Sequence, residues 1–124
     1  MIGLRFRKLL ALGVLLPIVV YAQGCKDSNP LETVSASLKN TETYEYPTVS
    51  GDEDGASIST QAKHYSISEF RRDSTTDWVA TYVYRPAPGF VGSDYVEIEI
   101  FTGSDGASPP TNIKRVAFQF TIHN

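Results

Sequence analysis

The sequence predicts an all-β protein, an antiparallel sandwich of six to seven short strands. Three observations support this fold class. Tyr, Val, Ile, Thr and Phe are abundant beyond residue 31, and no segment there repeats apolar residues at the spacing of a helix. Two segments near the C-terminus alternate apolar and polar residues, which is typical of strands with one buried face. Clusters of Gly, Pro, Asp and Ser separate these segments as turns.

The chain begins with a secretory leader. Arg5, Arg7 and Lys8 form its basic start, and an apolar run follows over residues 9–22. This run is shorter than the roughly 20 apolar residues that a membrane-spanning helix needs. The pattern therefore predicts a signal peptide that is removed from the mature protein.

Two cleavage sites are compatible with this leader. Residues 20–22 (Val-Tyr-Ala) suit ordinary signal peptidase, which would leave a chain that begins at Gln23. Residues 22–25 (Ala-Gln-Gly-Cys) resemble the lipobox of bacterial lipoproteins, although leucine is commonest where this chain has Ala22. Cleavage there would expose Cys25 for acylation, and residues 26–29 resemble the polar tether of Bacteroidota-type surface lipoproteins.

Cys25 is the only cysteine of the chain. An unpaired thiol is a liability in an oxidising compartment, and acylation removes it. Each buried methylene of an acyl chain contributes about 0.8 kcal/mol to membrane binding. We therefore expect a lipid anchor at Cys25 that holds the protein in a bacterial cell envelope, at the outer membrane. The expected domains are a signal peptide (1–24), a lipid-anchored tether (25–31) and one sandwich (32–124).

The charge of the mature chain excludes one class of partner. Removing the leader takes away three of the 11 basic residues and none of the 14 acidic ones, which leaves a net charge of −6. Nucleic-acid binding requires a basic surface, so we expect no nucleic-acid partner. The acidic balance favours solubility instead.

The first half of the sandwich is the less regular. Residues 31–38 and 43–49 are predicted strands, and residues 51–55 (Gly-Asp-Glu-Asp-Gly) are a turn. Residues 56–70 alternate roughly, with Ile58, Tyr65 and Ile67 as apolar positions. A polar connection follows over residues 71–77, and a strand is expected from Trp78 to Tyr84, with both of these rings in the core.

The second half alternates cleanly. Residues 94–101 direct three apolar side chains to one face and Glu97 and Glu99 to the other, and a loop rich in Gly, Ser and Pro follows over residues 102–112. The last strand covers residues 113–123. The side chains predicted to face the core are Val96, Ile98, Ile100, Val116, Phe118, Phe120 and Ile122.

Residues 84–94 form the most diagnostic motif, and its chemistry suits a structural role. Proline cannot donate to a strand ladder, so the preceding strand must end at Pro86. Glycine permits a tight reversal, and aspartate accepts hydrogen bonds from turn amides. Phe90 is expected to close the end of the sandwich. The motif residues are Tyr84, Pro86, Gly89, Phe90, Gly92 and Asp94.

This motif resembles the Tyr-x-Pro, Gly-Phe-x-Gly-x-Asp signature of bacterial cadherin-like and Ig-like surface modules. In those modules an alternating strand, an Asp-Gly turn and a final strand follow, as residues 94–101, 105–106 and 113–123 do here. The resemblance covers about the last 45 residues and implies an Ig/cadherin-like sandwich. Fold alone does not determine function.

No residue pattern predicts catalysis or a cofactor. Asp52, Glu53 and Asp54 are a weak calcium candidate, because calcium prefers oxygen ligands but needs six to eight of them. His64 and His123 are the only histidines, which is too few for zinc, and no Gly-x-Ser-x-Gly nucleophile motif occurs. We therefore expect a protein that is not an enzyme and has no cofactor.

Two aromatic residues define a candidate contact surface. Tyr95 and Phe101 lie on the face of Glu97 and Glu99, so we expect them to point outward, where they could stack on a sugar or seat a protein. The function that we expect is a non-catalytic, lipid-anchored module that binds an envelope protein or an extracellular glycan. The alternatives are a structural accessory subunit of an envelope complex and a small secreted hydrolase.

Overall fold

The computed structural model describes residues 29–49, 51 and 53–124. The predicted signal peptide, the lipidation site Cys25 and the calcium candidate Asp52 lie outside these residues. Within them no helix is both long and apolar enough to cross a membrane. The elements are β1 (Leu31–Lys39), β2 (Tyr44–Val49), β3 (Gly55–Thr60), β4 (Tyr65–Arg71), the short 3-10 helix η1 (Ser74–Thr76), β5 (Ala80–Pro86), β6 (Gly92–Thr102) and β7 (Asn112–His123).

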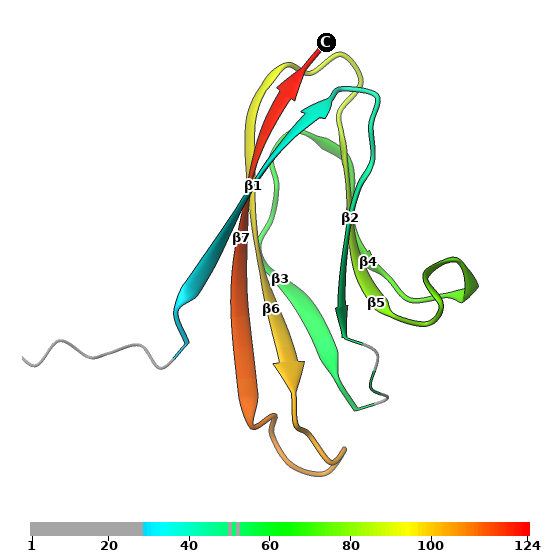
Figure 1. Cartoon of the computed structure of the whole chain (residues 1–124), viewed down its shortest axis with the longest axis vertical. Helices are drawn as coiled ribbons and strands as arrows, with labels where there is room; N and C mark the ends of the chain where they lie inside the picture. The colour runs from blue at the N-terminus through cyan, green and yellow to red at the C-terminus, as the bar shows by residue number, and fades with distance from the viewer. Residues whose placement is uncertain (1–28, 50, 52) are drawn as a thin grey trace, which may run out of the picture.

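The strands form two sheets that face each other as a sandwich (Figure 1). The four-stranded sheet has the order β1-β7-β6-β3, and the three-stranded sheet has the order β2-β5-β4. The predicted all-β sandwich of six to seven strands is thus confirmed, with seven strands. β1 begins at Leu31, inside the segment expected to be tether.

One strand pair departs from the antiparallel arrangement of the sandwich. β1 pairs with β7 in parallel, from Leu31 opposite Arg115 to Lys39 opposite His123. All other pairs are antiparallel. A parallel pair requires a long crossover connection, and here the whole chain between β1 and β7 supplies it. Strand alternation carries no information about the direction of the partner strand, so the sequence could not reveal this pairing.

An aromatic ladder fills the space between the sheets. Tyr84 of β5 stacks on Phe120 of β7 with ring centroids 4.1 Å apart, and Tyr82 stacks on Phe118 at 5.4 Å. Tyr44 of β2 packs edge-on against both phenylalanines. Such pairs stabilise a core beyond their buried area. All seven apolar side chains predicted to face the core from β6 and β7 are buried.

One prediction for the middle of the chain is wrong, that of Trp78 in the core. The roughly alternating residues 56–70 form two strands, β3 and β4, which belong to different sheets and are separated by residues 61–64. Trp78 is not in the core: its side chain is 65% exposed, and it precedes β5, which begins at Ala80. The alternation of Tyr82 and Tyr84 toward the core holds, but it does not extend back to Trp78. A left-handed turn intervenes there, with φ of 51° at Asp77 and 62° at Trp78.

Candidate functional site

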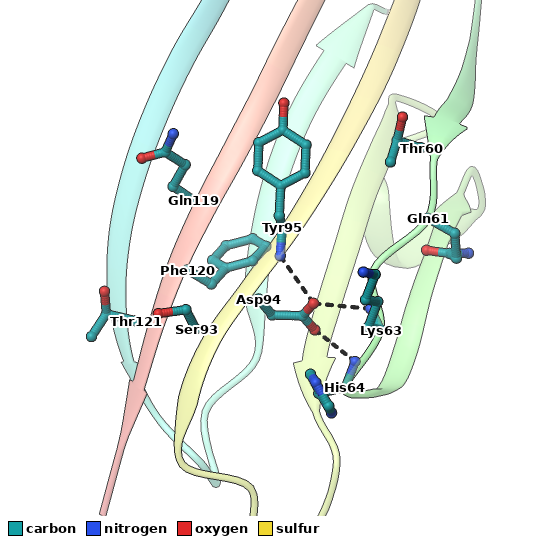
Figure 2. A pocket seen from close by; sticks show the side chains of 10 residues that line it. All are labelled: Thr60, Gln61, Lys63, His64, Ser93, Asp94, Tyr95, Gln119, Phe120 and Thr121. Carbon is teal, nitrogen blue, oxygen red and sulfur yellow. Dashed lines mark hydrogen bonds between the residues drawn. The ribbon is translucent and has the colours of Figure 1, made fainter.

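A hollow with a volume of about 510 Å³ lies where β3 separates from β6. Figure 2 shows the side chains that line it. β6 and β7 contribute one side, and the β3–β4 connection contributes the other. The lining residues are Thr60, Gln61, Lys63, His64, Ser93, Asp94, Tyr95, Gln119, Phe120 and Thr121.

Asp94 fixes the base of this hollow. It is only 6% exposed, and its carboxylate accepts four hydrogen bonds. Oδ1 accepts from the backbone amides of Lys63 and Tyr95, each at 2.9 Å. Oδ2 accepts from the amide of His64 at 2.9 Å and from the hydroxyl of Tyr84 at 2.8 Å. We call these five residues the Asp94 network; its three amide bonds are drawn in Figure 2.

The network joins the two sheets. Tyr84 lies on β5 in one sheet, Asp94 lies on β6 in the other, and residues 61–64 pass between β3 and β4. Buried polar groups need partners, and in the described residues no buried side-chain nitrogen or oxygen lacks one. The carboxylate therefore holds the β3–β4 connection beside β6 and shapes one wall of the hollow.

Asp94 and Tyr84 each keep one protonation state near neutral pH. Burial alone raises the pKa of Asp94, but the hydrogen bonds from the amides of Lys63 and His64, from Tyr84 and from the amide of Tyr95 outweigh it, so that the net pKa is lowered. Burial, and then the hydrogen bond to Asp94, raise the pKa of Tyr84. Near neutral pH the aspartate is therefore ionised and the phenol keeps its proton. This geometry suits structural support and does not suit general acid–base catalysis.

The mouth of the hollow is polar and holds one accessible aromatic ring. Tyr95 is 36% exposed, and its hydroxyl donates to the carboxylate of Glu97. Gln119 lies opposite Tyr95 in the strand register, and Thr121 lies opposite Ser93. In the described chain the side chains of Ser93, Gln119 and Thr121 make no hydrogen bond to protein. Their donors and acceptors face solvent beside a ring that is held on a rigid sheet.

The remaining motif residues shape the adjacent turn. Pro86 is buried at the end of β5. Gly89 has φ of 74° and Gly92 has φ of 143°, which favour glycine. A Cβ at Gly92 would also lie 3.2 Å from the ring of Phe90. That ring packs on the core and stacks on His64, with centroids 4.2 Å apart.

Tyr95 and Phe101 share a face of β6 but not a site. They are six residue steps apart along the strand, about 20 Å, and only Tyr95 lines the hollow. Phe101 is partly buried and pairs with Ile113.

The candidate metal ligands are not brought together among the described residues. No three His, Cys, Asp or Glu side chains there are placed to hold a metal ion. Asp54 accepts a hydrogen bond from the amide of Gly103 at 3.3 Å. The ring of His64 stacks on Phe90, whereas Nδ1 of His123 lies 3.0 Å from the backbone oxygen of Asn124.

Sequence reasoning identified part of the hollow. The sequence indicates Asp94 as a motif residue and Tyr95 as a contact residue, and its alternation predicts that Phe120 faces the core. The contribution of Lys63 was missed, because nothing local indicates that the β3–β4 connection lies against β6.

No protein-family model matches the chain, and no curated protein matches it. Among solved structures, a cysteine protease inhibitor from Entamoeba histolytica aligns over 75% of this chain and 95% of its own, with 9% identity and a TM-score of 0.45. An endo-fucoidan hydrolase of glycoside hydrolase family 107 aligns over 77% of this chain and 13% of its own, with 14% identity and a TM-score of 0.44. A sialyltransferase from Photobacterium damsela aligns over 74% of this chain and 18% of its own, with 14% identity and a TM-score of 0.35. Similarities this distant do not bear on what the chain does.

Proposed function

We propose that this chain is a non-catalytic binding module of a bacterial cell envelope, anchored through an acylated Cys25, that binds an extracellular glycan in the hollow beside Tyr95. The observation that carries the proposal is the exposed ring of Tyr95 next to unpaired polar side chains on a rigid sheet. A sugar offers the matching chemistry, because its C–H face stacks on an aromatic ring while its hydroxyls exchange hydrogen bonds at the rim.

The lining side chains suit a hydroxyl-rich ligand. The amide of Gln119 both donates and accepts, and so do the hydroxyls of Ser93 and Thr121. Lys63 adds an ammonium group on the opposite wall. Because the carboxylate of Asp94 is occupied by four hydrogen bonds, this ammonium favours a glycan that carries a carboxylate or sulfate group.

The surface-module assignment has two supports. Residues 84–94 resemble the signature of cadherin-like and Ig-like modules. The orders β2-β5-β4 and β7-β6-β3 also match the arrangement of immunoglobulin sandwiches, apart from the pairing of β1 with β7.

A titration of the full-length protein with neutral, uronic and sulfated oligosaccharides tests the glycan site. We expect saturable binding that weakens at least tenfold in Tyr95→Ser and in Gln119→Ala, with thermal stability within about 1 kcal/mol of the wild type. Tyr65→Ser is the matched control, because Tyr65 is also exposed, at 40%, but lies on β4 outside the hollow. Binding that survives both substitutions in the hollow would refute the site.

The anchor is tested separately by intact mass and membrane partition of the natively expressed protein and of Cys25→Ser. An acylated wild-type terminus, with the variant soluble or unprocessed, is the expected result. An unmodified chain that begins at Gln23 would exclude the anchor and leave the glycan site to be tested on a secreted protein.

A further inference from the structure

Trp78 is the most exposed large apolar side chain of the described residues, at 65%, and the only tryptophan of the chain. It lies in the connection between β4 and β5, residues 72–79, which we call the Trp78 connection. Figure 1 shows this connection standing out to the side of the three-stranded sheet. It lies outside the hollow of Tyr95 and shares no residue with it.

The connection is held in one conformation by its own hydrogen bonds. Oδ1 of Asp73 accepts from the amide of Thr75 at 2.8 Å, and the hydroxyl of Thr76 accepts from the amide of Asp73 at 3.1 Å. The backbone oxygen of Asp73 also accepts from the amide of Trp78 at 2.9 Å. An aromatic side chain on such a preformed backbone loses little conformational freedom when it binds a partner.

Arg72 attaches this connection to the rest of the domain. Its Nε donates to the backbone oxygen of Trp78 at 2.8 Å, and its Nη2 donates to the backbone oxygen of Gly51 at 2.6 Å. Nη1 reaches the backbone oxygen of Asp54 at 3.4 Å. The guanidinium is thus committed to carbonyl groups and positions Trp78 beside the β2–β3 connection.

The backbone conformation of Trp78 is unfavourable, and its exposed ring makes few packing contacts that could offset the strain. Its φ of 62° lies in the left-handed region, which is unfavourable for bulky side chains. Glycine would adopt the same backbone without strain. A strained residue with an exposed ring is consistent with a contact made outside the domain, since tryptophan is among the residues that dominate binding at protein interfaces.

The charges around the ring indicate the kind of partner. Asp73 and Asp77 belong to the same connection as Trp78, and both are at least partly exposed. The one cation of the connection, Arg72, is bonded to three backbone carbonyl groups, and the neighbouring Arg71 pairs with Glu69 at 3.5 Å. The connection that carries the indole is therefore net acidic, and an indole face itself attracts cations.

We propose that the Trp78 connection is a preformed docking site for a basic protein surface, in which a lysine or arginine side chain of the partner lies on the indole of Trp78 while neighbouring cations face Asp73 and Asp77. This site is independent of the proposed glycan site. The acidic rim speeds encounter with such a partner and selects against acidic ones.

The test uses the full-length protein and three dye-labelled peptides of equal length: oligo-arginine, oligo-glutamate and a neutral Gly-Ser peptide. Fluorescence anisotropy should report saturable binding of oligo-arginine only, weakened by added salt. Trp78→Gly should weaken this binding at least tenfold without lowering the melting temperature. Tyr95→Ser is the matched control, because it removes an exposed aromatic ring elsewhere, and it should bind oligo-arginine like the wild type.

Three results would overturn the proposal. They are equal affinity of Trp78→Gly for oligo-arginine, equal affinity of the wild type for the neutral peptide, and a shift of Trp78 fluorescence with phosphatidylcholine vesicles but not with oligo-arginine, which would indicate a membrane contact. Loss of glycan binding in Tyr95→Ser with peptide binding intact would separate this site from the proposed glycan site.

Discussion

The Asp94 network and the Trp78 connection use the same device in two environments. In each, an aspartate carboxylate accepts hydrogen bonds from the backbone, and a residue with a positive φ lies nearby. At Asp94 the associated ring, Tyr84, is fully buried and donates to the carboxylate, whereas at Asp73 the associated ring, Trp78, is exposed. Water can replace lost hydrogen bonds only in the second case. The comparison teaches that burial decides whether such a turn stabilises the fold or displays a side chain.

The largest expected effect is that of Asp94→Ala. The substitution leaves the amides of Lys63 and His64 and the hydroxyl of Tyr84 without their acceptor, at about 1–3 kcal/mol for each buried group that stays unpaired. We expect a loss of at least about 3 kcal/mol in the free energy of unfolding, measured by urea denaturation. Asp73→Ala should shift the urea midpoint far less. Equal losses in the two variants would show that burial does not distinguish the sites.

The contribution of Asp94 to stability should depend on pH. Because the folded pKa of Asp94 is lowered, its contribution to stability is complete above its unfolded value near 3.8 and is lost as the pH falls through the lower folded pKa. Unfolding free energies measured from about pH 6 down to about pH 2 should fall in the wild type. Asp94→Asn should be less stable at pH 6 and lose less on acidification. A variant that follows the wild-type slope would contradict the assignment.

Removing one hydroxyl from each of two core tyrosines sharpens the comparison within the core. The hydroxyl of Tyr84 bonds to a carboxylate, whereas that of Tyr82 bonds to the neutral hydroxyl of Ser68 at 2.8 Å. Tyr84→Phe should cost about 1.5–3 kcal/mol and Tyr82→Phe about 1 kcal/mol, measured by thermal unfolding. The reverse order would mean that the charge of Asp94 does not strengthen its hydrogen bonds.

The smallest effect, with the opposite sign, is expected for Trp78→Gly. Relief of the left-handed backbone should leave the protein as stable as the wild type or more stable by up to about 1 kcal/mol. Sequence alternation alone predicted a core ring, for which truncation costs about 3–5 kcal/mol. A calorimetric melting temperature distinguishes the two, and a loss above about 2 kcal/mol would place the ring in a packed environment after all.

The core of the protein could be read from the sequence. The alternation of residues 94–101 and 113–123 predicted seven buried side chains of β6 and β7 but not Ala117, and Pro86 marked the end of β5. Alternation is a local property that reports which face of its own strand each residue occupies. Because one side of each sheet must be buried, the local pattern was sufficient to predict a sandwich.

Only the tertiary structure decided how distant segments meet. It paired β1 with β7 in parallel, brought the amides of Lys63 and His64 to Asp94 some 30 residues away, and turned Trp78 outward just before β5. The alternation of apolar and polar residues along one strand encodes none of these outcomes. They depend on the direction of the partner strand, on amides from another connection and on the backbone of a left-handed turn. The sequence alone determined which residues are apolar and which face of β6 and β7 is buried. The packing of distant segments against one another determined which polar groups and rings come together at a surface.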